Sequence, residues 1–194
     1  SGHPHLQIID NRSGFDSKML RLIGEISAFL GEPEPLEIER KYLIEYPDIN
    51  WLKSFPNCRK VEISQTYLMS EPGEEIRVRQ RGENGSFVYF KTVKRKVSDM
   101  KRVEIEERLT QDEYLSLLME ADPEKRSIRK TRYCMTYAGH YLEIDLYPFW
   151  KDKAIMKVEL SNENAEIQFP EKLKILKEVT GDEAYRNSHL AVKH

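Results

Sequence analysis

Apolar and polar residues alternate along most of the chain from residue 36 to about residue 160, a period of two that predicts β-strands with one apolar face. In the segment 36–42, Glu37, Glu39 and Lys41 share one face, and the other face carries Leu36, Ile38 and Tyr42 together with Arg40. For a single strand this pattern is typical of an ordinary solvated face. A comparison with the later strands is therefore needed to tell whether these charges have a function.

The same arrangement returns in later strands, where charged side chains again share one face, in several strands opposite aliphatic residues. The aligned polar sets are Arg77, Arg79 and Arg81; Thr92 and Lys94; Glu104 and Glu106; Lys130 and Arg132; Glu143 and Asp145; and Lys157 and Glu159. Like charges two positions apart on one strand repel each other. Something in the fold must therefore offset them.

Helical spacing is confined to a few segments. Between residues 16 and 30 apolar residues recur every three or four positions, which predicts an amphipathic helix that ends at Gly31 and Pro33. Beyond these residues the apolar spacing changes from every three or four positions to every second position. We therefore expect residues 1–33 to form an N-terminal helical extension, the end of a preceding domain, and residues 34–194 to form the main domain.

Two further helices are expected within the main domain. Thr110 and Glu113 form a capping-box pattern, which predicts a short helix from that point. A second helix is expected to start at Pro170 and to stop at Gly181. Its inward-facing residues would be Leu173, Leu176 and Val179.

Two architectures can give so many strands an apolar and a charged face. In a sandwich the charged faces point outward to water, whereas in a closed barrel they point inward and helices cover the apolar exterior. Periodicity alone does not choose between them. The purity of the charged faces favours the barrel, because solvated sandwich faces usually mix charges with Thr, Ser and Gln.

Composition limits the partners of such a domain. The 194 residues include 31 basic and 33 acidic ones, a net charge of −2, which argues against coating nucleic acid or an anionic membrane. No apolar run approaches the roughly 20 residues of a membrane span. The lone cysteines, Cys58 and Cys134, fit a reducing compartment. We expect a cytoplasmic protein without a membrane or nucleic-acid partner.

Charges inside a barrel would have to be neutralised by each other, by metal ions or by an anionic ligand. A metal-bound polyphosphate supplies both kinds of partner. Carboxylates bind Mg²⁺ or Mn²⁺ through hard oxygen ligands, and Arg and Lys match phosphate oxygens.

The order of these motifs resembles the CYTH superfamily, the triphosphate tunnel metalloenzymes, over roughly residues 34–191. The motifs are Glu37-x-Glu39-x-Lys41, Arg77-x-Arg79, Thr92-Val93-Lys94, Glu104-x-Glu106, Lys130-x-Arg132, Glu143-x-Asp145 and Val158-Glu159-Leu160. The resemblance implies an α+β fold built on an eight-stranded antiparallel β-barrel, open at both ends, with helices packed outside. It also implies that the tunnel binds a linear triphosphate together with a divalent metal, Mg²⁺ or Mn²⁺.

The resemblance also implies a division of labour among the aligned residues. The implied metal ligands are the acids Glu37, Glu39, Glu104, Glu106, Glu143, Asp145 and Glu159. Phosphate binding falls to the cations Lys41, Arg77, Arg79, Lys94, Lys130 and Arg132. The residues closest to the chemistry would be Glu37, Glu39, Lys41 and Glu159. Most other basic residues between 91 and 102 are expected to face solvent, because only Lys94 matches the pattern.

The sequence departs from its relatives at Lys157. The family often carries an acid two residues before the glutamate that matches Glu159, and an ammonium there would weaken a second metal site or replace its charge. If the strand were shifted by one residue near Ala154, Lys157 would instead face outward.

Three functions fit this resemblance. The first is a metal-dependent hydrolase of inorganic or nucleoside triphosphates. The alternatives are a class IV-type adenylate cyclase and a polyphosphate-sensing module of a larger protein. The N-terminal residues resemble the end of a P-loop kinase or ATPase domain, but the chain contains no GxxxxGK[ST] motif, so any such fused domain would lie outside it.

Overall fold

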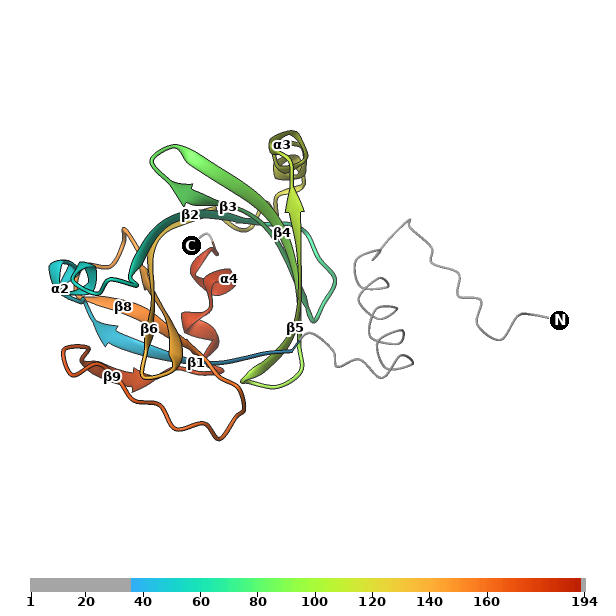
Figure 1. Ribbon diagram of the computed structural model, residues 1–194. Helices are drawn as coiled ribbons and strands as arrows, with labels where there is room; N and C mark the ends of the chain where they lie inside the picture. The colour runs from blue at the N-terminus through green and yellow to red at the C-terminus, as the bar shows by residue number, and fades with distance from the viewer. Residues whose placement is uncertain (1–35, 193–194) are drawn as a thin grey trace.

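The computed structural model describes residues 36–192, which form a closed antiparallel β-barrel (Figure 1). Eight strands make the wall in the order β5-β4-β3-β2-β6-β7-β8-β1, and β1 pairs with β5 to close it. The strands are β1 (Leu36–Glu45), β2 (Arg59–Tyr67), β3 (Glu74–Glu83), β4 (Ser86–Lys96), β5 (Lys101–Leu109), β6 (Ile128–Tyr137), β7 (His140–Leu146) and β8 (Lys153–Glu159). The barrel predicted from the sequence is therefore confirmed, and the sandwich is excluded.

Strand β1 joins two neighbours on the same edge. Its first residues pair with β5, in the register Glu37 opposite Arg102. Farther along, Tyr42 pairs with Glu178 of a ninth strand, β9 (Ile175–Glu178), which lies outside the barrel. The far end of β1 thus has a hydrogen-bonding partner after β5 has diverged from it.

The prediction of a helix from Pro170 to Gly181 is wrong, because the centre of this segment forms strand β9. Leu173 and Val179 are buried as expected, but Leu176 is 50% exposed. The edge of β1 that β5 leaves unpaired provides a ladder for this segment. Tertiary pairing of this kind overrides a helical pattern as short as this one.

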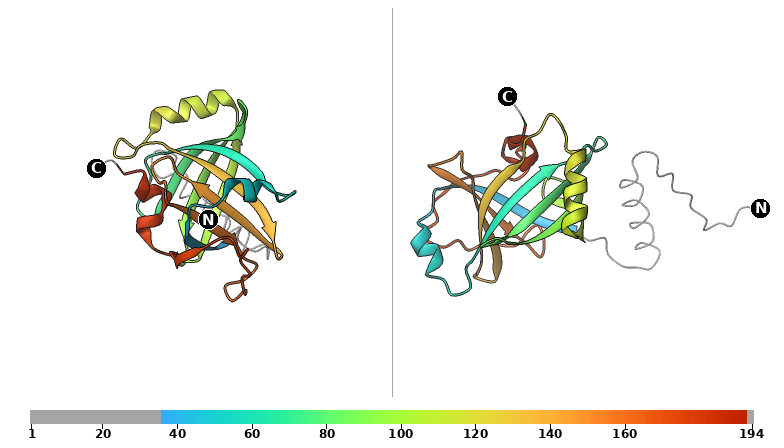
Figure 2. Two further views of the ribbon diagram at one scale, coloured as in Figure 1. Left: turned by 90° about the vertical axis from the view of Figure 1, so that its left-hand side faces the viewer. Right: turned by 90° about the horizontal axis from the view of Figure 1, so that it is seen from above.

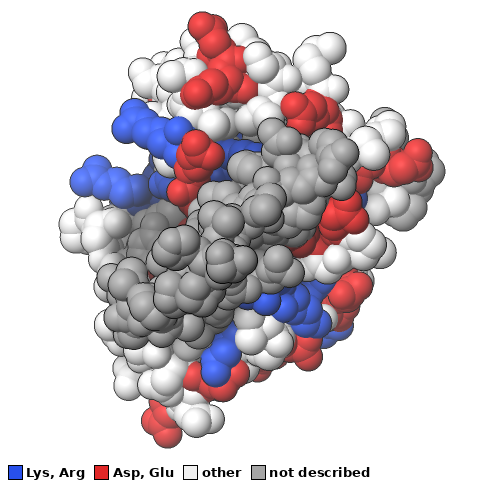
Figure 3. Space-filling model, turned by 90° about the vertical axis from the view of Figure 1, so that its right-hand side faces the viewer, with Lys and Arg blue, Asp and Glu red and all other residues white. Residues whose placement is uncertain are grey.

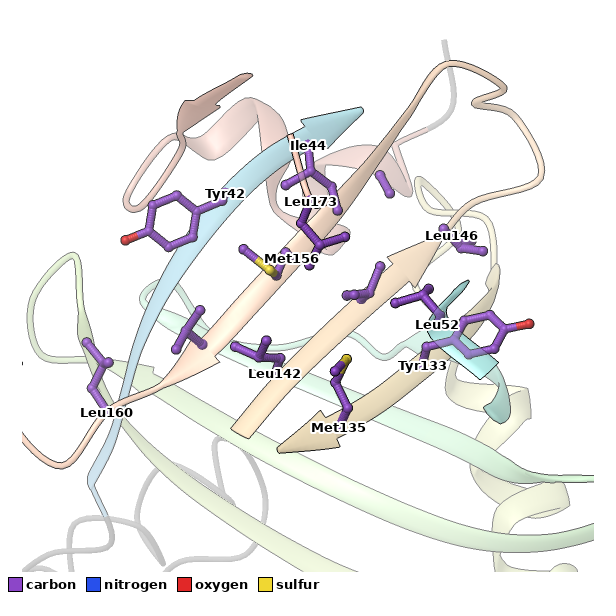
Figure 4. Packing of buried hydrophobic residues seen from close by; sticks show 13 residues of the cluster. Tyr42, Ile44, Leu52, Tyr133, Met135, Leu142, Leu146, Met156, Leu160 and Leu173 are labelled. Atoms are coloured by element: carbon purple, nitrogen blue, oxygen red, sulfur yellow. The ribbon is translucent and has the colours of Figure 1, made fainter. Parts of the chain in front are cut away.

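The largest group of buried apolar side chains lies on the outside of the barrel. The largest cluster lies on the outer faces of β1, β6, β7 and β8, and includes Tyr42, Met135, Leu142 and Met156 (Figure 4). Leu52 of the short helix α2 (Ile49–Lys53) packs into it and is fully buried. The hydrophobic effect therefore holds the wall from outside, and the tunnel is left to polar groups.

A second apolar cluster lies under helix α3 (Gln111–Leu117), against β3, β4 and β5. The predicted capping box is present, since the Thr110 hydroxyl accepts from the Glu113 amide and the Glu113 carboxylate accepts from the Thr110 amide. Tyr114 of α3 packs against Tyr89 with their ring centroids 4.8 Å apart. Helices α2 and α3 thus lie outside the barrel, as expected.

The C-terminal segment closes one end of the tunnel. Helix α4 (Asn187–Leu190) lies within the ring of strands in Figure 1, and Figure 2 places it at one end. An apolar cluster there joins Leu43 of β1 and Ile155 of β8 to Ala191. Because Leu43 follows tunnel-facing Lys41 by two positions, the inner wall itself becomes apolar at this end. The C-terminal segment therefore lies over this end of the tunnel.

The expected helix within residues 16–30 and the extension of residues 1–33 lie outside the described residues. Between residues 36 and 192, no helix is both long and apolar enough to cross a bilayer.

Candidate functional site

The charged faces of the strands point into the barrel. Glu39, Lys41, Arg77, Lys94, Arg132 and Asp145 are each at most 8% exposed, although most charged residues in proteins lie at the surface. On the outer face shown in Figure 3, acidic and basic side chains are interspersed. Charged side chains are therefore buried in the tunnel as well as spread over this face.

The tunnel contains a basic cavity of about 410 Å³ at the end that the C-terminal segment closes. Glu183 and Asn187 belong to its wall, together with strand residues. Its acidic residues are Glu74, Glu75 and Glu183. They are outnumbered by Lys41, Arg77, Lys94, Lys96, Arg102, Lys125, Lys157 and Arg186. We call this the basic cavity.

The other end of the tunnel contains an acidic cavity of about 530 Å³. Its cations are Arg79, Arg81, Arg132 and Lys157, and Val61, Ile63 and Tyr141 add apolar surface. Its carboxylates are Glu37, Glu104, Glu106, Glu143 and Glu159. We call this the acidic cavity. Lys157 is common to both walls and so marks their junction.

The structure thus brings most of the predicted site together, but in two groups. Of the predicted cations, three line the basic cavity and two line the acidic one, whereas Lys130 lines neither. Among the predicted acids, Glu39 and Asp145 lie buried behind the cavity walls. One end of the tunnel is therefore dominated by cations, and at the other end carboxylates slightly outnumber cations.

Several tunnel carboxylates form ion pairs with cations of neighbouring strands. Glu37 accepts from Lys94 Nζ at 2.8 Å, and Lys94 also pairs with Glu104. Arg79 pairs with Glu106, and Lys157 with Glu39. By contrast, Glu159 forms no ion pair with any residue in the described range. Its carboxylate faces the acidic cavity without a partner.

Asp145 is fully buried beneath two cations. Lys130 Nζ donates to its Oδ2 at 2.6 Å, and Arg132 donates to both of its oxygens through Nε at 2.6 Å and through Nη2 at 2.9 Å. Tyr147 covers Lys130, with Nζ 5.8 Å from the ring centroid. Because both carboxylate oxygens are engaged, this arrangement favours a structural role for Asp145 and Lys130.

These pairs determine the protonation of the acids. Burial raises the pKa of Glu37, but Lys157 and Lys94 outweigh it and hold the pKa well below its usual range. The same balance, with Lys157 as the main opposing charge, gives Glu39 a pKa of about 2. Burial and repulsion from Glu143 instead raise the pKa of Glu159. Glu159 is thus the better proton acceptor of the three.

Lys41 is a buried ammonium near its titration point. Burial, reinforced by repulsion from Lys157, lowers its pKa to about 8 despite the attraction of Glu39. Lys41 lines the basic cavity, where an anion would restore its charge. An anion that contacts Lys41 should therefore bind with uptake of a proton.

We predict that this proton uptake makes triphosphate binding depend on pH. The ammonium fraction of Lys41 falls about tenfold for each pH unit above its pKa, so affinity should drop by up to about tenfold between pH 7 and pH 9. Calorimetric titration of the protein with triphosphate, in the absence of metal, measures this affinity at each pH. Lys41→Arg keeps the charge at both values and should flatten this part of the profile, whereas parallel profiles would mean that Lys41 does not contact the anion.

The tunnel carboxylates have the chemistry of ligands for a divalent metal. Glu39 Oε1 is buried and has no hydrogen-bond partner, and it lies beside the hard carboxylate oxygens that Mg²⁺ and Mn²⁺ prefer. Within residues 36–192, however, no three acidic, His or Cys side chains form a metal-ligand group. The residues fit such an ion in chemistry. To bind it, Glu37 and Glu39 must exchange their ammonium partners for the metal.

Sequence reasoning missed part of the basic cavity. Lys96 and Arg102 were expected to face solvent, yet both line this cavity, and Arg102 Nη1 lies 3.5 Å from Glu39 Oε1. Strand period could have found them, because Lys96 follows Lys94 by two and Arg102 precedes Glu104 by two. Lys125 and Arg186 come from outside the barrel strands, so no strand pattern points to them.

The protein is thus a closed antiparallel β-barrel with a charged tunnel through it. Residues 35–186 match the CYTH domain family, and the chain belongs to this family. Among curated proteins, no sequence matches the chain.

Solved structures give the same fold. The inorganic triphosphatase NE1496 is 27% identical, with a TM-score of 0.52 over 81% of this chain and 95% of that one. Another structure of NE1496, described as a hypothetical protein, has the same identity and TM-score. The match covers 81% of this chain and 98% of that one. A conserved hypothetical protein from Pyrococcus furiosus is 19% identical, with a TM-score of 0.50 over 66% of this chain and 80% of its own, and shows the fold alone.

Proposed function

We propose that this chain hydrolyses triphosphates in a divalent-metal-dependent reaction inside the tunnel. The observation that carries the proposal is the division of the tunnel into a basic and an acidic cavity that meet at Lys157. A metal-bound triphosphate has the matching charges, since its phosphates are anionic and its metal is cationic. The similarity to the inorganic triphosphatase NE1496 supports the same reaction class.

The basic cavity would hold the phosphate chain. Lys41, Arg77 and Lys94 line it, and Arg77 Nε is buried without a hydrogen-bond partner, so this donor is available to a phosphate oxygen. Arginine and lysine donors to phosphate form charge-assisted hydrogen bonds, which are the strong class. The phosphate oxygens would thereby replace the carboxylates that Lys94 and Arg77 now contact.

The acids released by this exchange would hold the metal. Glu37 and Glu39 are its ligands in this proposal, and Glu104 and Glu106 of the acidic cavity wall support them. When bound, the metal ion would neutralise the negative charge that develops on the phosphates during transfer to water. Glu159, with its raised pKa and free carboxylate, would accept the proton of the attacking water.

A phosphate-release assay tests this function. With Mg²⁺ or Mn²⁺, triphosphate should release orthophosphate, ATP should be hydrolysed more slowly or equally, and pyrophosphate should release little, because the cations of the tunnel are spread over a length suited to a longer anion. Absence of turnover on all three substrates in the presence of metal would refute the hydrolase. Formation of cyclic AMP from ATP would identify a cyclase instead.

Arg79→Ala should mainly weaken substrate binding. Arg79 lines the acidic cavity, pairs with Glu106, and has a buried Nε without a partner. Loss of a charge-assisted hydrogen bond costs about 1.5–3 kcal/mol, so KM should rise by about 10- to 150-fold while kcat changes less. Steady-state kinetics measure both constants.

The matched control is Arg59→Ala, since Arg59 is exposed at the start of β2. Its KM should stay within about twofold of the parent, as expected for a surface substitution. Equal, small effects of the two variants would remove Arg79 from the binding site.

One feature favours a second candidate, a triphosphate-sensing module that binds without turnover. Lys157 occupies a position where an additional acid would serve the metal chemistry. Tight, metal-dependent triphosphate binding in calorimetry, combined with no phosphate release, would support the sensor over the hydrolase.

A further inference from the structure

Lys157 lies at the junction of the two tunnel cavities. It is opposite Lys41 in the β1–β8 ladder and opposite Glu143 in the β7–β8 ladder, and its side chain is 11% exposed. The alternative of a strand shifted near Ala154 is excluded, because the ladder is continuous from Lys153 to Glu159 and Lys157 faces the tunnel.

Carboxylates surround this ammonium. Lys157 Nζ donates a hydrogen bond to Glu39 Oε2. Burial lowers the pKa of Lys157, but the charges of Glu39 and Glu37, with a smaller contribution from Glu143, outweigh burial and raise it above the usual range. The ammonium of Lys157 therefore lies among acids of two neighbouring strands, β1 and β7, and is hydrogen-bonded to one of them, Glu39.

A cation at this place has two consequences for metal binding. It neutralises negative charge on Glu39 that a divalent ion would otherwise neutralise. It also repels any ion that approaches Glu143 and Glu159 from the acidic cavity. A single metal ion at Glu37 and Glu39 then remains compatible with the tunnel, provided that Lys157 turns from Glu39 to a phosphate oxygen.

We propose that Lys157 takes the place of a second divalent ion, so that the tunnel binds one metal ion per triphosphate. This inference rests on the proposed function, and it adds the metal stoichiometry and a residue that determines it. Because Lys157 lines both cavities, its ammonium would lie between the phosphates in the basic cavity and the carboxylates of the acidic cavity.

The test counts bound Mn²⁺ rather than activity. The protein is saturated with the imido analogue of triphosphate, whose bridging nitrogens resist hydrolysis, and Mn²⁺ is titrated while free ion is followed by electron paramagnetic resonance. The parent should bind one Mn²⁺ per chain. Lys157→Glu restores an acidic pair with Glu159 and should bind a second ion.

Two further variants keep the result interpretable. Lys151→Glu makes the same change of charge at an exposed position outside both cavities and should keep one ion. Lys157→Met removes the ammonium without adding an acid, so it should admit a second, weaker ion even if Lys157→Glu fails to fold.

The outcomes separate this inference from the function on which it rests. Two ions in the parent, or one ion in both Lys157 variants, would overturn the role of Lys157 while leaving the triphosphatase intact. A parent that binds no Mn²⁺ together with the analogue would refute the proposed function and the inference with it.

Discussion

Glu39→Gln is expected to lower kcat for triphosphate by about 100-fold or more. Loss of residues that only orient a metal ligand costs about 10- to 100-fold, and Glu39 is proposed as a ligand itself. Its Oε1 is the buried acceptor that has no hydrogen-bond partner, and glutamine keeps the volume of the side chain while removing its charge. Phosphate release at saturating metal and substrate measures the effect.

The control for this variant is Glu62→Gln, the same substitution on a half-exposed carboxylate that pairs with Lys60 on β2. It should leave kcat within about twofold of the parent, as for most surface substitutions. Thermal unfolding of both variants shows whether a loss of kcat reflects a loss of fold. A folded Glu39→Gln variant with parental kcat would remove Glu39 from the metal site.

Asp145→Asn is expected to cause the largest loss of stability, about 3–5 kcal/mol. The substitution leaves the ammonium of Lys130 and the guanidinium of Arg132 buried without their shared counter-charge. Denaturant unfolding measures the change. Asp152→Asn, at an exposed position, is the matched control and should stay within about 0.5 kcal/mol of the parent.

The buried triad also predicts a pH dependence of stability. Burial raises the pKa of Asp145, but Arg132 and Lys130 outweigh it and hold the pKa far below its usual range. The stabilisation is therefore complete above the unfolded-state pKa of about 3.9 and is lost as the pH falls below it. Asp145→Asn should flatten this acid limb. An unchanged acid limb would mean that the triad does not control it.

The strand pattern predicted the wall of the barrel because the period of two is a property of each strand alone. Glu37, Arg77 and Glu104 could be assigned to one inner surface in this way. The pattern could not say which ends of the tunnel would be basic or acidic. That division depends on strand register, which places Lys41 toward the basic cavity and Glu37 toward the acidic one.

Elements outside the barrel strands were harder to predict. The segment around Leu176 has the composition of a helix, but the free edge of β1 makes it a strand. Arg186 reaches the basic cavity only because the C-terminal segment folds over one end of the tunnel. Contacts of this kind depend on residues far apart in sequence, which local periodicity does not record.

The central claim is that a metal-bound triphosphate occupies the tunnel with its phosphates in the basic cavity. A crystal structure of the protein with Mn²⁺ and the imido analogue of triphosphate, with anomalous scattering to locate the metal, tests it most directly. We predict a Mn²⁺ peak beside Glu37 and Glu39, and phosphates in contact with Lys41, Arg77 and Lys94. An analogue bound outside the barrel, or a tunnel whose carboxylates keep all their Lys and Arg partners, would contradict the claim.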